Sequence, residues 1–267
     1  MGTFWILTIL ALFGTGLTVS AQATQGRMGT FPQLAWGTFE VSGKQASWKT
    51  TMIFINVGSE TQPVTVRAYQ TQNGVPMEMQ IKGALPTTVL EFEVPSSGMR
   101  QIELDENVNG LRVGWAEVQT GSSIRGQGVY TLAIDGQATS QALVPLLVRE
   151  TVQCLVPLPF SPASSPNVLI LPFDNTGFVT SFAFANTTDN PRMLNVTFRD
   201  ENGVVIYNLF ASIPPRGHMA FETTNYVELK GKKGQAIVSQ DVEAWSAIGF
   251  LFNDQARTFT TILPVLK

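Results

Sequence analysis

The sequence contains a single cysteine, Cys154, and a single histidine, His218, among its 267 residues. One cysteine cannot form an intrachain disulfide, so packing alone must hold the fold together. Cys154 lies in an apolar stretch and is interpreted as a small buried hydrophobe. One histidine excludes the multi-histidine zinc site of a metallohydrolase. A Ser-His-Asp triad through His218 is disfavoured, because the sequence has no G-x-S-x-G element.

Charge is also scarce, at 14% of residues with a net charge of -3. This excludes the concentrated positive potential that nucleic-acid binding requires. The densest basic group, Lys230, Lys232 and Lys233, is interpreted as a solvated hairpin turn. Helical periodicity is absent, whereas 23 glycines and 15 prolines indicate a folded chain rich in turns.

The first 21 residues carry no charged side chain and end in the small residues Val19, Ser20 and Ala21. This pattern predicts a secretory signal peptide, cleaved after Ala21 or, alternatively, after Ala23. A retained anchor is the rival interpretation, although the apolar run 4–19 is shorter than the roughly 20 residues of a spanning helix. We therefore expect a secreted, periplasmic or cell-surface protein with no membrane span in its mature form.

Residues 48–74 recur as residues 178–203, so the chain is one unit written twice. Each copy has an aromatic residue, an apolar run ending in Asn, a polar turn with Pro, an alternating run and an Asn-Gly turn. Period-two alternation with turns every 8 to 15 residues or so predicts antiparallel strands. The predicted order is a signal peptide (1–21), a flexible leader (22–30), a β-sandwich (31–150), a Pro-rich linker (151–166) and a second β-sandwich (167–267).

The predicted fold class is all-β, with two tandem immunoglobulin-like sandwiches related by internal duplication. A single large β-barrel and a jelly roll are the alternatives. The copies differ at an insertion around residues 41–47 of the first copy, at the turn 174–177 of the second, and in the linker around Cys154. Function is to be sought at these differences.

Four motifs carry a resemblance: T-S-F-A-F-A-N-T, V-T-F-R-D-E-N-G, I-P-P-R-G-H and the terminal I-L-P-V-L. With them the chain resembles a group of uncharacterised secreted bacterial proteins built from two tandem β-sandwich repeats. The resemblance covers both halves and implies the fold and the export. It implies no activity, catalytic residue or cofactor. The first copy departs from the pattern through its insertion and through V-P-S-S-G in place of I-P-P-R-G.

Trp36 is the one tryptophan that sequence reasoning offers as a ligand-binding residue, for stacking on a sugar ring. Its neighbours Ala35 and Gly37 are loop-like, whereas Trp115 and Trp245 lie in apolar strands and are expected in the core. Trp48 corresponds to Phe178 in the second copy, which indicates a structural role.

Asp200, Glu201 and Asn202 form a weak candidate Ca²⁺ site, since carboxylate and amide oxygens suit that ion. The same residues, followed by Gly203, are typical of a hairpin turn, which is the favoured interpretation. The strand-end residues Asn56 and Asn186 are expected to hydrogen-bond the adjoining turn backbone.

We expect an exported, non-enzymatic binding or structural module of the cell envelope or surface. It carries no cofactor, and strand edges offer a route to a homo-oligomer. The expected partner is a protein or glycan at the cell surface. The alternatives are a carbohydrate-binding accessory module, an envelope chaperone with two immunoglobulin-like domains, and a hydrolase that uses acidic residues.

Overall fold

The computed structural model describes residues 26–41, 43–149, 168–253 and 258–267. The predicted signal peptide, the predicted linker and Cys154 lie outside the described residues. The described chain is all-β, with short 3-10 turns as its only helical elements. None of its helical segments has the length and apolar character needed to cross a membrane.

Module 1, residues 26–149, is a β-sandwich. Its strands are β1 (Arg27–Val41), β2 (Lys44–Asn56), β3 (Gln62–Gln70), β4 (Val89–Val94), β5 (Met99–Glu103), β6 (Arg112–Thr120), β7 (Ile124–Ile134), β8 (Gln137–Pro145) and β9 (Leu147–Arg149). Sheet A has the order β4-β3-β6-β1-β9, and sheet B has the order β5-β2-β7-β8. The far half of β1 also pairs with β2, which joins the two sheets.

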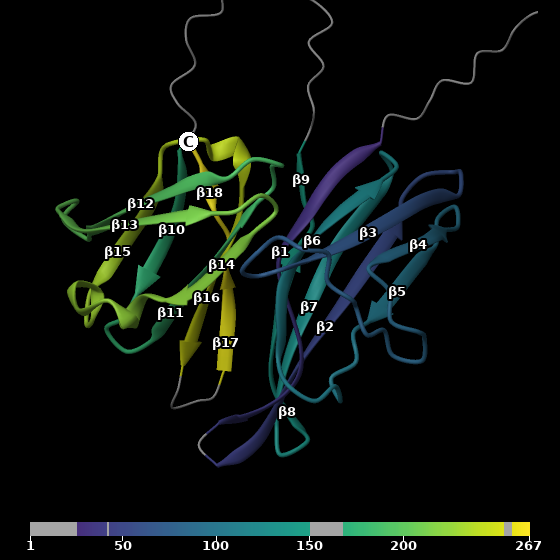
Figure 1. The fold of residues 1–267 in the computed structure, drawn as a ribbon, viewed down its shortest axis with the longest axis horizontal. Helices are drawn as coiled ribbons and strands as arrows, with labels where there is room; N and C mark the ends of the chain where they lie inside the picture. The colour runs from purple at the N-terminus through teal and green to yellow at the C-terminus, as the bar shows by residue number, and fades with distance from the viewer. Residues whose placement is uncertain (1–25, 42, 150–167, 254–257) are drawn as a thin grey trace, which may run out of the picture.

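Module 2, residues 168–267, repeats this plan (Figure 1). Its strands and turns are β10 (Leu169–Asp174), β11 (Val179–Asn186), β12 (Arg192–Asp200), β13 (Val205–Ile213), β14 (His218–Glu222), η1 (Thr223–Asn225), η2 (Val227–Leu229), β15 (Lys233–Val238), η3 (Val242–Ala244), β16 (Trp245–Asn253), β17 (Thr258–Ile262) and β18 (Val265–Leu266). Sheet A′ has the order β13-β12-β15-β10-β18, and sheet B′ has the order β14-β11-β16-β17. Strand for strand, this is the order of sheets A and B.

The strand order corrects one part of the sequence prediction. Immunoglobulin constant domains place strands A, B, E and D in one sheet and C, F and G in the other. In both modules the second strand is a neighbour of the fifth and the third of the sixth, as in that fold. The first strand, however, lies beside the sixth, and the seventh lies beside the second. Relative to that fold the first and seventh strands therefore exchange sheets, and the fourth strand lies beside the third instead of the fifth, so the immunoglobulin-like assignment is not confirmed for these three strands.

Strand β1 begins at Arg27, inside the predicted flexible leader, and Gly29 and Thr30 are buried. The predicted leader is therefore too long at its C-terminal end, because β1 pairs with β6 from Arg27 and with β9 from Met28. A bulge between Phe31 and Leu34 interrupts the pairing with β6. A bulge lets a strand bend, and this one comes shortly before β1 changes partners, from β6 at Trp36 to β2 at Gly37.

The strand-end asparagines have the same hydrogen bonds in both modules. Asn56 Nδ2 donates to the carbonyls of Glu60, Val94 and Pro95, and its Oδ1 accepts from the Gly58 N–H. Asn186 makes the corresponding set, with Nδ2 donating to three carbonyls and Oδ1 accepting from a backbone N–H; its partners are Asn190, Ile213, Pro214 and Thr188. Both side chains are buried. The prediction that these residues fix the adjoining turns is confirmed.

A glycine recurs for a steric reason. A Cβ on Gly114 in β6 would overlap the carbonyl oxygen of Tyr69, and a Cβ on Gly234 in β15 would overlap that of Arg199. Counted from Asn56 and Asn186, Tyr69 and Arg199 are equivalent positions. In both modules, therefore, a glycine in the sixth strand lets that strand approach the third strand closely.

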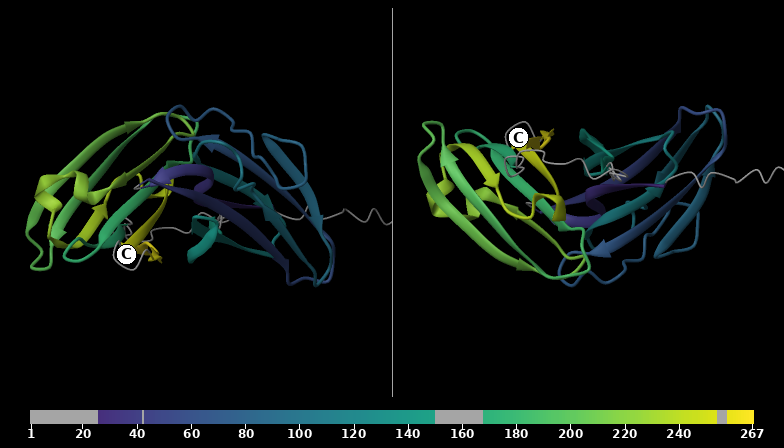
Figure 2. Two further views of the ribbon diagram at one scale, coloured as in Figure 1. Left: turned by 90° about the horizontal axis from the view of Figure 1, so that it is seen from below. Right: turned by 90° about the horizontal axis from the view of Figure 1, so that it is seen from above.

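The hydrophobic core is not divided evenly between the modules. The core of module 2 contains residues of module 2 alone, among them Phe182, Phe184 and Phe198. The core of module 1 extends across the module boundary to Ala183, Ile248, Phe250 and Phe259. Figure 2 shows the modules inclined to each other like the arms of a V, with the C-terminus on the concave side.

Candidate functional site: the interface between the two modules

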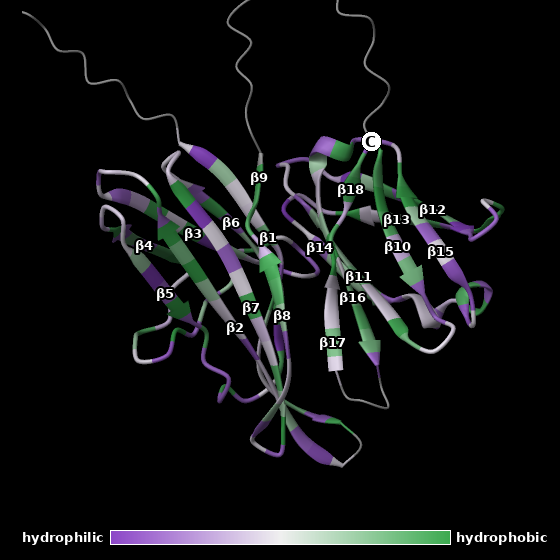
Figure 3. Ribbon diagram, turned by 180° about the vertical axis from the view of Figure 1, so that it is seen from behind, coloured by the Kyte–Doolittle hydropathy of each residue, from purple (hydrophilic) through white to green (hydrophobic). Residues whose placement is uncertain are grey.

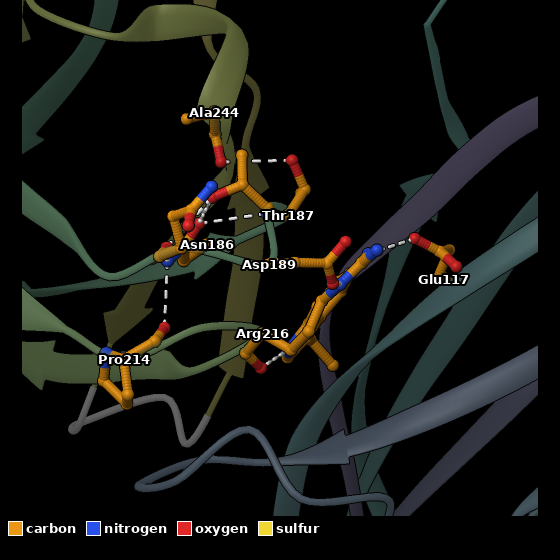
Figure 4. A network of polar contacts seen from close by, with 10 residues as sticks. Glu117, Asn186, Thr187, Asp189, Pro214, Arg216 and Ala244 are labelled. Carbon is orange, nitrogen blue, oxygen red and sulfur yellow. Dashed lines mark hydrogen bonds and ion pairs between the residues drawn. The ribbon is translucent and has the colours of Figure 1, made fainter.

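The turn 214–217 between β13 and β14 inserts Arg216 into module 1 (Figure 4). The Arg216 guanidinium pairs with Glu117 of β6 and with Asp189 of its own module, the latter at 2.8 Å. It also lies over the Tyr69 ring, 5.8 Å from the centroid, in cation–π geometry. The Arg216 carbonyl accepts a 2.8 Å hydrogen bond from Trp115 Nε1.

Burial decides which of these contacts matters most. The Glu117 side chain is 13% exposed and that of Arg216 is 22% exposed, whereas Asp189 is 82% exposed. An exposed ion pair contributes little, but a buried charge that loses its partner is costly. The Arg216–Glu117 pair is therefore the contact on which the interface depends.

This arrangement shifts the pKa values of two neighbouring groups, Asp189 and Tyr69. The hydrogen bond from Arg216 lowers the pKa of Asp189, so this carboxylate is charged at neutral pH. Burial raises the pKa of Tyr69, and the neighbouring Glu117 acts in the same direction. Tyr69 is consequently a neutral ring, stacked on Trp115 at a centroid distance of 4.9 Å.

His218 follows the same turn and is buried in the interface. Its backbone N–H donates to the Thr71 carbonyl at 2.9 Å, and its ring Nδ1 lies 3.3 Å from Thr71 Oγ1. Burial lowers the pKa of His218 to about 4, while the Pro32 carbonyl acts in the opposite direction. At neutral pH the imidazole is uncharged and packs at the first position of β14.

A glycine turn of module 1 completes this side of the interface. A Cβ on Gly74 would overlap the Pro215 carbonyl oxygen, and Gly74 has a φ of +63°. The recurring Asn-Gly turn therefore has two roles in module 1. It reverses the chain, as in module 2, and it admits the backbone of the opposite module.

Apolar side chains make up most of the rest of the interface. Ala183, Ile248 and Phe250 project outward from sheet B′ into the core of module 1, where Phe250 meets Tyr130 edge-on at 5.8 Å. At its upper edge, Thr30 Oγ1 and Ser246 Oγ are 2.6 Å apart. Small side chains on sheet B′ let the two modules approach closely.

The edge strands β8 and β17 meet along the module boundary (Figure 3). Ser140 Oγ accepts from the Phe259 N–H at 2.9 Å, and Thr261 Oγ1 donates to the Leu143 carbonyl at 2.7 Å. Two edges that would otherwise expose unpaired backbone groups thus cover each other.

A pocket of about 620 Å³ opens between the modules below this contact. Three aromatic rings line it: Phe39 and Trp48 from module 1 and Phe252 from module 2. Lys44 and Glu222 supply charged groups at its rim, since both are exposed. The volume is in the range of small-molecule sites, and the lining combines apolar faces with a few polar groups. Val41 and Lys44, which belong to the insertion that distinguishes the first copy, line this pocket.

Trp36 is not at this pocket. It is fully buried in module 1, and its Nε1 donates to Gln80 Oε1 at 2.9 Å. No face of the ring is available to a sugar, so the prediction of Trp36 as a ligand-binding residue is wrong. The segment Ala35 to Gly37, interpreted from sequence as a loop, is part of the long strand β1.

The three residues of the candidate Ca²⁺ site make a hairpin turn between β12 and β13. Asp200 Oδ1 accepts the N–H groups of Asn202 and Val204, each at 2.9 Å, and Glu201 pairs with Lys233 at 3.0 Å. Within the described ranges, no group of three or more His, Cys, Asp or Glu side chains is arranged to hold a metal ion. The turn interpretation is the one that these contacts bear out.

Sequence reasoning missed the residues that build the interface, Arg216, Glu117 and Tyr69, and the pocket residue Trp48. The sequence does hold one indication of the interface. Two of these positions have a charged residue in one copy and an uncharged residue in the other. Arg216 corresponds to Ser97, and Glu117 corresponds to Ile237. Comparisons with protein-family models, with curated proteins and with solved structures find no match to this chain.

Proposed function

We propose that the chain is an exported, non-enzymatic binding or structural module of the cell envelope or surface, formed by duplication of one β-sandwich unit. The identical strand order, the equivalent asparagines and the equivalent close-approach glycines support the duplication. The apolar, uncharged segment 1–21 supports export.

The observation that carries the proposal is the buried interface between the modules. Arg216 and its pairing with Glu117, the stacked rings and the shared core hold both modules in one arrangement. A fixed spacing between the outer surfaces suits a structural or binding role. The strands β4 and β13 end sheets A and A′ on the outer sides, where strand addition is possible.

Fractionation of the native host tests export. We expect the protein in the envelope or the medium, with an N-terminus at Gln22 or Thr24 by intact-mass analysis. A cytosolic protein that keeps residues 1–21 would contradict the proposal.

A second candidate function, carbohydrate binding, is favoured by the pocket of Phe39, Trp48 and Phe252. Aromatic rings stack on the apolar face of a sugar, and polar rim groups such as Lys44 and Glu222 can bond its hydroxyls. The site that sequence reasoning assigned to Trp36 would then lie at Trp48.

Affinity electrophoresis through gels containing soluble glucans, chitin oligomers or peptidoglycan fragments tests this candidate. We expect retardation by at least one of them and its loss in Trp48→Ala. The matched control is Phe178→Ala, which removes the equivalent aromatic residue of module 2, outside the pocket. Carbohydrate binding is ruled out for this site if no gel retards the wild type, or if both variants behave alike.

A further inference from the structure

Gln33 lies in the bulge of β1 and has no counterpart in module 2. Two residues, Pro32 and Gln33, separate the pairs that Phe31 and Leu34 make with β6. At the equivalent place in module 2 a single residue, Pro172, separates the corresponding pairs of β10 with β15, and the register runs on without a shift. A bulge can redirect a side chain out of the regular alternation of a strand. Gln33 is therefore an extra residue of the first copy, in a position that can serve a site of its own.

This residue lines a cavity of about 190 Å³ between the two modules. Strand β1 contacts β11 and β16 across the module boundary (Figure 1). Both modules contribute to the wall, with Ala35 and Val113 from sheet A and with Ser181 and Ala183 from sheet B′. The short side chains of Ala35, Ser181 and Ala183 leave space between the two sheets.

The rest of the cavity wall is largely aromatic. Four of its side chains carry a ring that lies at the module boundary: Trp48, Tyr130, Phe250 and Phe252. Among the described residues that form the wall, none carries a charge. An apolar cavity of about 150 Å³ holds a benzene molecule, so this cavity has room for one aromatic ring with a small substituent. A charged ligand would lose its water here without gaining a partner, so the wall selects a neutral one.

Gln33 places a polar atom without a partner at this cavity. Its Oε1 is buried and, within the described part of the chain, accepts no hydrogen bond. The Tyr130 hydroxyl does not serve this atom, because it donates to the backbone carbonyl of Gln33. A buried acceptor without a donor is costly, and a ligand that brings an O–H or N–H group removes that cost.

We propose that this cavity binds a small neutral molecule with one aromatic ring and one hydroxyl or amino group. The ring packs among the four aromatic side chains, and the hydroxyl or amino group donates to Gln33 Oε1. The proposal goes beyond the envelope role and the carbohydrate candidate, because the ligand is apolar and has a single ring. Since both modules form the wall, the bound ligand also stabilises their arrangement.

The cavity can be tested separately from the larger pocket of Phe39, Trp48 and Phe252. The two spaces share Trp48 and Phe252, whereas Gln33 and Ala220 line the cavity and not the pocket. Ala220 is exposed and therefore lies at the open side of the cavity. Substitutions at Gln33 and Ala220 change the cavity and leave the pocket intact.

Ligand-observed NMR titration of the purified protein with phenol and with toluene tests the site. We expect phenol to bind at least about 5-fold more tightly than toluene, because its hydroxyl supplies the hydrogen bond that Gln33 Oε1 lacks. In Gln33→Leu this preference should disappear or reverse, since the hydroxyl then loses its water without finding an acceptor.

A second variant tests the place of binding without touching the acceptor. Ala220→Leu narrows the open side of the cavity and should weaken phenol binding by ~10-fold or more. The matched control is Ala138→Leu, at an exposed alanine of β8 outside the cavity wall, which should bind phenol as the wild type does.

Two results would overturn the proposal. One is a wild type that binds phenol no more tightly than toluene, which includes a protein that binds neither. The other is phenol binding that Gln33→Leu and Ala220→Leu both retain unchanged. Neither result affects the proposed export, which fractionation tests, or the carbohydrate candidate, which Trp48→Ala tests.

Discussion

Module 1 and module 2 share one strand order but present different surfaces at equivalent places. The interior asparagines, Asn56 and Asn186, and the close-approach glycines, Gly114 and Gly234, have the same contacts in both. The outward positions differ, as Glu117 against Ile237 and Ser97 against Arg216 show. The comparison teaches that the interior specifies the fold of each module, whereas the differences on the outer faces determine how the modules assemble.

The largest expected effect concerns the interior, where the modules are alike. Asn186→Ala and Asn56→Ala each remove a buried amide that serves three carbonyls and one N–H. Leaving such groups without partners should lower the free energy of unfolding by about 3–4 kcal/mol in each case. Urea unfolding measures it, and a loss under about 1 kcal/mol in one module alone would break the equivalence.

The next effect depends on pH and on His218 of module 2, whose equivalent in module 1 is Met99. His218 has a folded pKa of about 4 against an ordinary value of 6.5, so the unfolded chain binds more protons between these values. Stability should therefore fall by roughly 3 kcal/mol as the pH drops from 6.5 to 4.

His218→Met, which restores the residue of the other module, is the control for this pH effect. It should remove the pH dependence from this window while the protein stays folded. Thermal unfolding from pH 4 to 7 measures both proteins, and parallel curves would show that His218 is not responsible.

The smallest effect compares the two equivalent turns. Arg216→Ala should destabilise the protein by about 2 kcal/mol, because it leaves the Glu117 carboxylate buried without its partner. Ser97→Ala changes the same position of module 1 and should stay within about 0.5 kcal/mol. Equal losses in the two variants, by chemical denaturation, would contradict the asymmetry of the interface.

Much of each module was predictable from sequence because its determinants are local. Strand alternation, the Asn-Gly turns and the roles of Asn56 and Asn186 depend on neighbours within a few residues or on the adjacent strand. The interface was not predictable in this way. Arg216 and Glu117 are distant in sequence, and a charged residue in an alternating strand is, by default, one that faces solvent.

Trp36 shows the limit of local reasoning most plainly. Its small neighbours indicated a loop, yet β1 passes through all three residues as it crosses from sheet A to sheet B. Gly37 is needed there because its φ is +100° and a Cβ would overlap the carbonyl oxygens of Val108 and Gly110, in the loop before β6. The cause lies in the tertiary arrangement, which a window of a few residues does not contain.

The double-mutant cycle of Arg216→Ala and Glu117→Ala tests the central claim most directly, namely that this pair holds the modules in one arrangement. We expect a coupling free energy of about 2 kcal/mol in urea unfolding, because the second substitution removes the charge that the first left unpaired. A coupling free energy near zero would contradict the account.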